Sequence, residues 1–236
     1  MPLLLEHGAN PNLVNGQGQT VLHLLAERAV REQQERQQVQ GGSPRAPSDS
    51  VGSSVGGDDA DGAPEDGAVL PVTRLIALLA EHNLSLDAQE AEKGDTAMHI
   101  AAFGGCIEVC VQLVSLGASV GLPNKDGFTP LDSSYRDPND PSQSLQTLLL
   151  SKITKPSSWT PDRMVSACQI CKLPFNKADP KMARKHHCRH CGRCVCSVCS
   201  PRRMPIPKFG TNAQERVCLL CERMLQQEPP QRASFS

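Results

Sequence analysis

Aromatic residues are scarce in this chain of 236 residues, which contains one Trp, one Tyr and five Phe. Aromatic side chains supply much of the area buried in a large domain core, and only 39% of the residues are hydrophobic. We therefore expect no single large core. A stack of small units, or small domains stabilised by metal, fits this composition better.

Long apolar runs are lacking as well. No stretch approaches 18 apolar residues, so the sequence predicts no membrane-spanning helix. The opening residues 1–5 have no basic segment before them and only three leucines before Glu6, which is not the pattern of a secretory signal. We expect a protein of the reducing cytoplasm, where paired cysteines indicate metal binding before disulfides.

Patterns typical of catalysis are absent too. The sequence has no paired carboxylates, Cys-His nucleophile or Gly-rich phosphate loop in a context that suggests a reaction. Its basic cluster also lacks the interleaved aromatic residues on which nucleic-acid bases stack. The sequence therefore predicts neither an enzyme nor a nucleic-acid-binding protein.

Charge is divided unevenly along the chain, although the formal net charge is −1. Residues 156–236 carry 14 Lys/Arg and 5 Asp/Glu, whereas the remainder carries 10 and 20. The C-terminal part is thus expected to bind an anionic partner. On charge alone, nucleic acid, an anionic membrane and a phosphorylated ligand all remain open.

A repeated pattern occupies the N-terminal part. The segment GDTAMHIAA begins at Gly94, and GFTPL begins at Gly127, 33 residues later. A related segment, GQTVLHLLA, begins at Gly18. The period and the Thr-Pro-Leu-His-like box resemble ankyrin repeats, which implies an all-α solenoid of helix pairs. His23 and His99 are then expected to make structural hydrogen bonds.

The remaining parts of the repeats depart from the pattern. An insertion follows the first unit, and its Gly-, Ser- and Asp-rich part, residues 41–71, is expected to be a disordered acidic loop. The last unit is degenerate, because Asp132 replaces the His of the box and Pro138 and Pro141 interrupt the turn. The chain starts within a unit, from which we expect a longer ankyrin array.

Four Cys-x-x-Cys pairs lie between residues 168 and 221, separated by 16, 4 and 18 residues. Each pair can place two sulfurs on one zinc ion. The four-residue gap is too short for consecutive pairs to share an ion, so we expect an interleaved cross-brace with two structural Zn²⁺. The expected ligand sets are Cys168, Cys171, Cys196 and Cys199 for one ion, and Cys188, Cys191, Cys218 and Cys221 for the other. Cys194 is expected to be a spare thiol, and Cys106 and Cys110 to be packing residues.

Spacing alone allows a RING-type, PHD-type or FYVE-type cross-brace. Three further motifs are present: Trp159-x-x-Asp162, RKHHCR at 184–189 and RVC at 216–218. Together and in this order they resemble the FYVE zinc finger, which has short β-hairpins and a C-terminal helix. Combined with the repeats, they resemble the C-terminal part of rabankyrin-type endosomal proteins. The alternative is a RING-like ubiquitin ligase, but a RING places His among its ligands, and all eight here are Cys.

The resemblance implies a non-enzymatic adaptor on the cytosolic face of early endosomes, which binds phosphatidylinositol 3-phosphate through the finger. Its ankyrin repeats would bind proteins, with a Rab GTPase as a candidate partner. Met182 is the only large apolar side chain where FYVE fingers insert into the bilayer, so it is the expected membrane tip. The lipid-binding residues implied by the motifs are Trp159, Asp162, Arg184, Lys185, His186, His187, Arg189 and Arg216.

The expected organisation follows from these motifs. It comprises partial ankyrin repeats at 1–40, the acidic insertion at 41–71, ankyrin repeats at 72–152, the FYVE-type finger at 156–226 and a flexible tail at 227–236.

Overall fold

The computed structural model describes residues 5–40, 71–133 and 142–227. The acidic insertion up to residue 70, Pro138, Pro141 and the tail from residue 228 lie outside these ranges, so the expectations for them stand as expectations. Within the described ranges, no helix is both long and apolar enough to cross a lipid bilayer.

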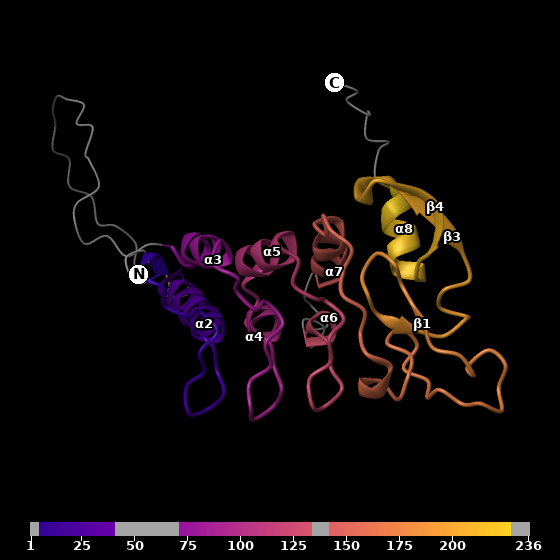
Figure 1. The fold of residues 1–236 in the computed structure, drawn as a ribbon, viewed down its shortest axis with the longest axis horizontal. Helices are drawn as coiled ribbons and strands as arrows, with labels where there is room; N and C mark the ends of the chain where they lie inside the picture. The colour runs from indigo at the N-terminus through magenta and orange to yellow at the C-terminus, as the bar shows by residue number, and fades with distance from the viewer. Residues whose placement is uncertain (1–4, 41–70, 134–141, 228–236) are drawn as a thin grey trace, which may run out of the picture.

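The N-terminal part consists of two rows of helices (Figure 1). One row contains α2 (Val21–Gln40), α4 (Ala97–Phe103) and α6 (Pro130–Ser133), and the other contains α3 (Val72–Ala80), α5 (Ile107–Leu116) and α7 (Ser142–Ser151). Neighbours within each row contact one another. The extended loops that precede α2, α4 and α6 lie side by side below the helices in Figure 1.

Histidines of the repeat box connect adjacent helix pairs. Thr96 caps α4, and the backbone N–H of Thr96 donates to Nδ1 of His99 at 3.1 Å. The other ring nitrogen, Nε2, lies 3.0 Å from the carbonyl oxygen of Phe128, in the loop of the next pair. His23 repeats this arrangement, with its Nε2 3.1 Å from the carbonyl oxygen of Asp95. The structural role expected for both histidines is confirmed by these bonds.

The degenerate last unit makes a different connection. Asp132 caps its own unit by accepting a hydrogen bond from the N–H of Thr129 at 3.0 Å. Its other carboxylate oxygen lies 2.7 Å from Nζ of Lys172, which belongs to the zinc-finger region. In the earlier units a histidine contacts a backbone carbonyl oxygen of the next unit. In the last unit the carboxylate of Asp132 takes that place, and its partner is the ammonium group of Lys172.

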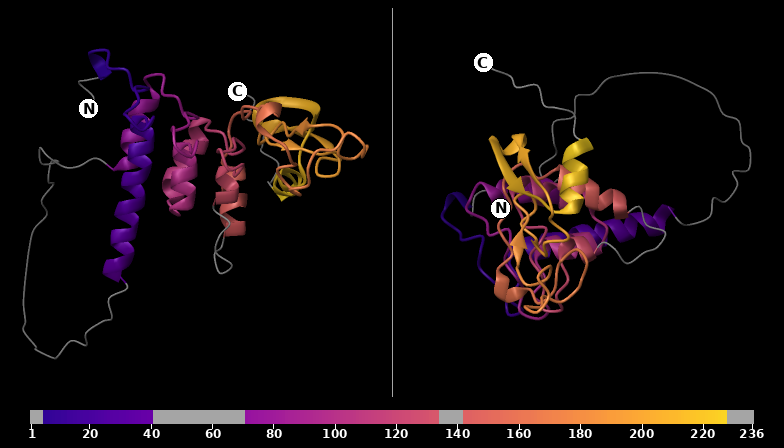
Figure 2. Two further views of the ribbon diagram at one scale, coloured as in Figure 1. Left: turned by 90° about the horizontal axis from the view of Figure 1, so that it is seen from below. Right: turned by 90° about the vertical axis from the view of Figure 1, so that its right-hand side faces the viewer.

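The C-terminal part is built from two small antiparallel hairpins and a helix. Strand β1 (His186–His187) pairs with β2 (Cys194–Val195), and β3 (Arg203–Ile206) pairs with β4 (Thr211–Arg216). Single-turn 3-10 helices lie at Asp162–Met164 and Pro207–Phe209, and α8 spans Leu219–Gln227. Helix α8 packs against α7, so the finger follows directly on the row of helix pairs, as the two views of Figure 2 also show.

Within the row of α2, α4 and α6, the end of α4 packs tightly against α2. A Cβ atom added to Gly104 would lie 2.2 Å from a methyl carbon of Val30, well inside van der Waals contact. The backbone of Gly104 is helical, with φ −77°, so the side chain of an alanine there would be limited by packing alone.

We therefore expect Gly104→Ala to lower the free energy of unfolding by about 1–3 kcal/mol, the usual cost of overpacking a core. The double variant Gly104→Ala/Val30→Ala provides the control, because removing the Val30 methyls makes room for the new Cβ. Denaturant unfolding followed by circular dichroism measures both. Equal stability of the single variant and the wild type would contradict this close approach.

Candidate zinc centre and anion-binding surface

The eight paired cysteines form two clusters. Each cluster has four sulfur atoms that all lie within 4.8 Å of one another. The first cluster joins the pair at 168/171 to the pair at 196/199, and the second joins the pair at 188/191 to the pair at 218/221. Four close sulfurs are the donor set of a closed tetrahedral zinc site. The members of the first cluster are Cys168, Cys171, Cys196 and Cys199, and those of the second are Cys188, Cys191, Cys218 and Cys221.

Hydrogen-bond donors surround the sulfur atoms of both clusters. The backbone N–H of Cys196 lies 3.4 Å from Sγ of Cys168, and the N–H of Cys218 lies 3.3 Å from Sγ of Cys188. Hydrogen bonds from the neighbouring cysteines lower the pKa of Cys191, whereas burial raises the pKa of Cys188 and of Cys221. Donors aimed at sulfur stabilise the thiolate form, which is the form that binds metal.

Two buried side chains, Arg193 and His190, complete the surroundings of the second cluster. Nε of Arg193 lies 3.3 Å from Sγ of Cys191, and Nδ1 of His190 lies 3.2 Å from Sγ of Cys221. Burial lowers the pKa of His190 to about 3, so its ring is neutral and can donate one N–H. Donation from Nδ1 to a thiolate leaves Nε2 as the acceptor, and Nε2 has no hydrogen-bond partner among the described residues.

Sequence reasoning assigned no function to these two residues. His190 lies outside the FYVE-like motif, and Arg193 only ends the run RKHHCRHCGR at 184–193, which resembles rabankyrin-type proteins without giving this arginine a role. The only signal available was their position within two residues of predicted ligands, which is where side chains that orient ligands often lie.

A third group brings together Asp162, His187 and Cys194, whose ligand atoms also lie within 4.8 Å of one another. Here Nε2 of His187 already lies 2.9 Å from the carbonyl oxygen of Thr160 and 3.2 Å from Oδ1 of Asp162. Burial raises the pKa of Cys194 to about 12. The Cys194 thiol therefore stays protonated, as suits the spare thiol that the sequence predicts.

The aromatic member of the FYVE-like motifs lies on the basic surface. Trp159, which is 53% exposed, stacks on the ring of His187 with ring centroids 5.2 Å apart. The guanidinium carbon of Arg189 lies 3.9 Å from the centroid of the Trp159 ring. Since Asp162 pairs with His187, four of the eight residues expected to bind lipid form one connected set.

Like charges face each other on the adjacent hairpin. Arg203 of β3 and Arg216 of β4 are direct cross-strand partners, an arrangement that is normally destabilising. Burial lowers the pKa of His186, and the nearby Arg216, Arg184 and Arg203 lower it further. No carboxylate in the described part of the chain pairs with these three arginines. This surface thus carries positive charge that a bound anion would neutralise.

Arg203 was missed by the sequence reasoning, because it lies outside the three motifs and 13 positions before Arg216. Only the register of the β3–β4 hairpin brings the two side chains together. Lys185, by contrast, is turned inward: its Nζ lies 2.6 Å from the carbonyl oxygens of both Asp162 and Val165. In this structure it stabilises the loop of Asp162 and does not point into the arginine cluster.

The expected membrane tip at Met182 is wrong in this structure. Its side chain is only 6% exposed and belongs to the hydrophobic core. Its N–H and carbonyl groups bond to Asp179 and Asn176, which folds the loop back on itself and turns this side chain inward. The exposed apolar residue nearby is Val198, which follows a serine whose N–H bonds to the carbonyl oxygen of Lys181.

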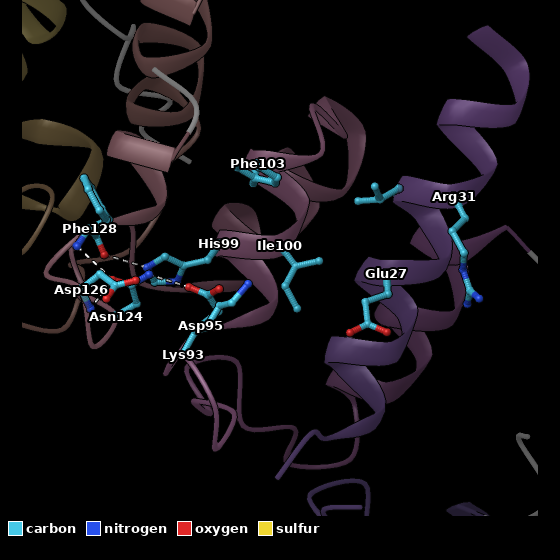
Figure 3. Close-up of a pocket in the computed structure, with 11 residues that line it drawn as sticks. Glu27, Arg31, Lys93, Asp95, His99, Ile100, Phe103, Asn124, Asp126 and Phe128 are labelled. Atoms are coloured by element: carbon cyan, nitrogen blue, oxygen red, sulfur yellow. Dashed lines mark hydrogen bonds between the residues drawn. The ribbon is translucent and has the colours of Figure 1, made fainter. Parts of the chain in front are cut away.

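A separate cavity of about 560 Å³ lies on the helix pairs, between α2, α4 and the loops below them (Figure 3). Phe103 on α4 is 68% exposed there, and Phe128 adds a second partly exposed ring. Carboxylates line the same cavity at Glu27, Asp95 and Asp126, together with the cations Arg31 and Lys93. The cavity therefore combines apolar surface with charges of both signs, of which three are acidic and two are basic.

Comparison with known families identifies the two kinds of domain. Residues 158–227 match the FYVE zinc finger, and residues 93–125 match the ankyrin repeat. The chain thus contains a FYVE-type finger and an ankyrin repeat, two domains of a non-enzymatic, binding type. The finger implies zinc binding, and the two cysteine clusters fit that metal.

Two relatives and one solved structure are similar to parts of the chain. The chain is 33% identical over 136 residues to Rabankyrin-5 of Mus musculus and of Homo sapiens, a match that covers 58% of this chain and 10% of each relative. The chain therefore spans a small part of the length of these relatives. A solved FYVE domain, LM5-1 from Leishmania major, is 36% identical and covers 30% of this chain and 81% of its own, with a TM-score of 0.28.

The metal ligands can be separated from the spare thiol by paired variants. We expect Cys196→Ser to lower the zinc content of the purified protein, because it removes one of four sulfurs from a closed site. We expect Cys194→Ser, two residues away, to leave the zinc content unchanged. Metal analysis by mass spectrometry after gel filtration measures both. Loss of zinc from Cys194→Ser would contradict the assignment of Cys194 as the spare thiol.

Proposed function

We propose that this protein is an adaptor that binds phosphatidylinositol 3-phosphate on the cytosolic face of early endosomes and recruits proteins through an ankyrin solenoid. The finger holds two Zn²⁺, one in each cysteine cluster. These ions are structural, since four sulfurs leave no open position for a reacting water. The RING-like ligase alternative has less support, because both sulfur clusters contain cysteine alone.

The observation that carries the lipid proposal is the unneutralised arginine cluster at the hairpins. A phosphomonoester offers three acceptor oxygens and nearly two negative charges, which guanidinium groups match well. Arg184, Arg203 and Arg216 would contact phosphate, and Arg189 would close the site from the Trp159 side. An anion there would also relieve the repulsion between Arg203 and Arg216.

Asp162 would determine which phosphoinositide binds. A carboxylate accepts hydrogen bonds from inositol hydroxyls but repels an additional phosphate at the same ring position. Its loop is held in place by Lys185 and His187. Specificity for a singly substituted ring would thus come from one fixed acid beside a group of cations.

Contact with the bilayer would be shallow. Because Met182 is buried, the membrane-facing residues on this side would be Val198, Lys177 and Lys181, which offer one apolar side chain and two cations for anionic lipid. Binding by one finger would be weak for this reason, and several fingers or a bound partner would strengthen it.

We expect Arg203→Ala to weaken binding to liposomes containing phosphatidylinositol 3-phosphate by about tenfold or more, in line with the loss of one charge-assisted hydrogen bond of about 1.5–3 kcal/mol. Arg223→Ala is the matched control, since it removes the same charge from α8, beside α7. Liposome sedimentation measures both variants.

The same assay tests specificity. Liposomes with phosphatidylinositol 4-phosphate or with phosphatidylserine at equal charge should bind the wild type less well. Asp162→Ala should reduce the preference between the phosphoinositides. Equal binding to all three liposomes would show general attraction to anionic membranes. It would exclude specific recognition of phosphatidylinositol 3-phosphate.

The cavity beside Phe103 supports protein binding by the helix pairs. Its exposed rings and its three carboxylates fit a partner segment in which an apolar side chain lies next to Lys or Arg. A Rab GTPase is the candidate partner, because the similar proteins are named Rabankyrin-5. Such a segment would lie across α2 and α4, with its apolar residue between Phe103 and Phe128.

We expect Phe103→Ser to weaken binding of a GTP-loaded Rab GTPase by about tenfold or more, because truncating a central aromatic anchor typically costs about 2 kcal/mol. Ile107→Ser is the control, since it removes another exposed apolar side chain outside this cavity. Isothermal titration against purified Rab GTPases measures the affinities. Equal effects of the two variants would place the partner elsewhere.

A further inference from the structure

One buried cation connects the second cysteine cluster to the helix pairs. Arg193 is only 2% exposed, and its Nε and Nη2 lie 3.3 Å and 3.8 Å from the sulfurs of Cys191 and Cys218. No carboxylate within the described ranges pairs with it. An unpaired buried guanidinium is costly, so thiolate sulfurs must supply its counter-charge.

The charge of the metal site explains why a cation is needed there. Four thiolates around one Zn²⁺ carry a formal net charge of −2. This cluster is buried throughout, so water cannot compensate the charge. Arg193 supplies one positive charge, and Nδ1 of His190 lies 3.2 Å from a third sulfur, that of Cys221.

The aliphatic part of Arg193 lies against the loop that follows α5. A Cβ atom added to Gly121 of that loop would lie 2.7 Å from Cγ of Arg193, so only glycine allows this approach. The carbonyl oxygen of Gly121 accepts hydrogen bonds from Oγ1 of Thr160 at 2.7 Å and from Nε2 of Gln169 at 2.8 Å. Oε1 of Gln169 in turn accepts from the N–H of Cys194 at 2.6 Å.

These contacts fix both the guanidinium group and the aliphatic part of the Arg193 side chain. Its guanidinium is held by the sulfurs, and its aliphatic part is confined by the Gly121 loop, which Thr160 and Gln169 fix in position. The salt bridge between Asp132 and Lys172 holds the same two parts of the chain together. Movement of the helix pairs away from the finger would therefore release Arg193.

We propose that Arg193 is a positioning residue for the metal of the cluster at 188, 191, 218 and 221, and that the Gly121 loop keeps it in place. The helix pairs thereby slow the loss of zinc from the finger. This inference rests on the proposed assignment of two zinc ions. It predicts that a change in the repeats, outside the finger's sequence, alters metal retention.

Zinc transfer from the full chain to an excess of the coloured chelator 4-(2-pyridylazo)resorcinol tests the proposal. Arg193→Met removes the charge but keeps most of the side-chain volume, and it should accelerate release of one of the two ions by about 10- to 100-fold, as expected when an outer-shell partner is lost. Arg193→Lys, which keeps the charge without the planar fork, should show a smaller acceleration.

Gly121→Ala should accelerate the same phase, because its Cβ would push against Arg193. Gly16→Ala is the matched control, since a Cβ there meets nothing within 4 Å, and its kinetics should equal those of the wild type. Circular dichroism before chelation checks that each variant is folded, and Gly121→Ala and Arg193→Lys carry the test should Arg193→Met fail to fold.

Wild-type kinetics in Arg193→Met, or in Arg193→Lys if only that variant folds, would overturn the role of the guanidinium. Faster release in the Arg193 variants with wild-type kinetics in Gly121→Ala would overturn the role of the helix pairs. The zinc content of the untreated wild type is measured separately. A value below two ions per chain would contradict the two-zinc assignment and not the contacts of Arg193.

Discussion

The finger depends on the gathering of eight cysteine sulfurs into two clusters. Its hairpins are short, with β1 and β2 of two residues each, and hairpins of this size are not stable in isolation. Several cysteines supply most of its fully buried side chains, so the sulfur clusters take the place of an apolar core. The loops that carry Trp159, Asp162 and the arginines are positioned because the cysteines between them are fixed.

The helix pairs obey a different constraint, which is the need to satisfy backbone groups between adjacent loops. His23 and His99 each cap their own helix and reach a carbonyl oxygen of the following unit. This series of contacts ends at Asp132, whose carboxylate forms an ion pair with Lys172. The row of repeats is thereby continued by the finger, whose helix α8 lies against α7 (Figure 1).

Local features were predictable from the sequence because they depend on neighbouring residues. The repeat period, the helix caps and the cysteine spacing are all set within short segments, and the sulfurs cluster in the interleaved way that the short gap between Cys191 and Cys196 required. Features that depend on tertiary packing were not predictable. Met182 was expected at an exposed tip because it is the only large apolar side chain in the segment where FYVE fingers insert into the bilayer, but the loop turns its side chain into the core.

The remaining misses have the same physical origin. Arg203 joins the arginine cluster only through hairpin register, and Arg193 has a role only because a glycine 72 positions earlier leaves room for it. In the sequence, Asp132 only replaces the histidine of the repeat box. Its ion pair with Lys172 depends on the tertiary contact between the repeats and the finger. Long-range contacts of this kind carry no periodic signal in one sequence.

The length of α2 has a consequence for how the protein would search a membrane surface. Its 20 residues extend beyond the helices beside it (Figure 2), and at the other end of the row α7 packs against α8 of the finger. Once the finger is bound to lipid as proposed, the cavity beside Phe103 would be confined to the vicinity of the bilayer. A partner on the same membrane would then be met in two dimensions, which raises its effective concentration without any additional contact.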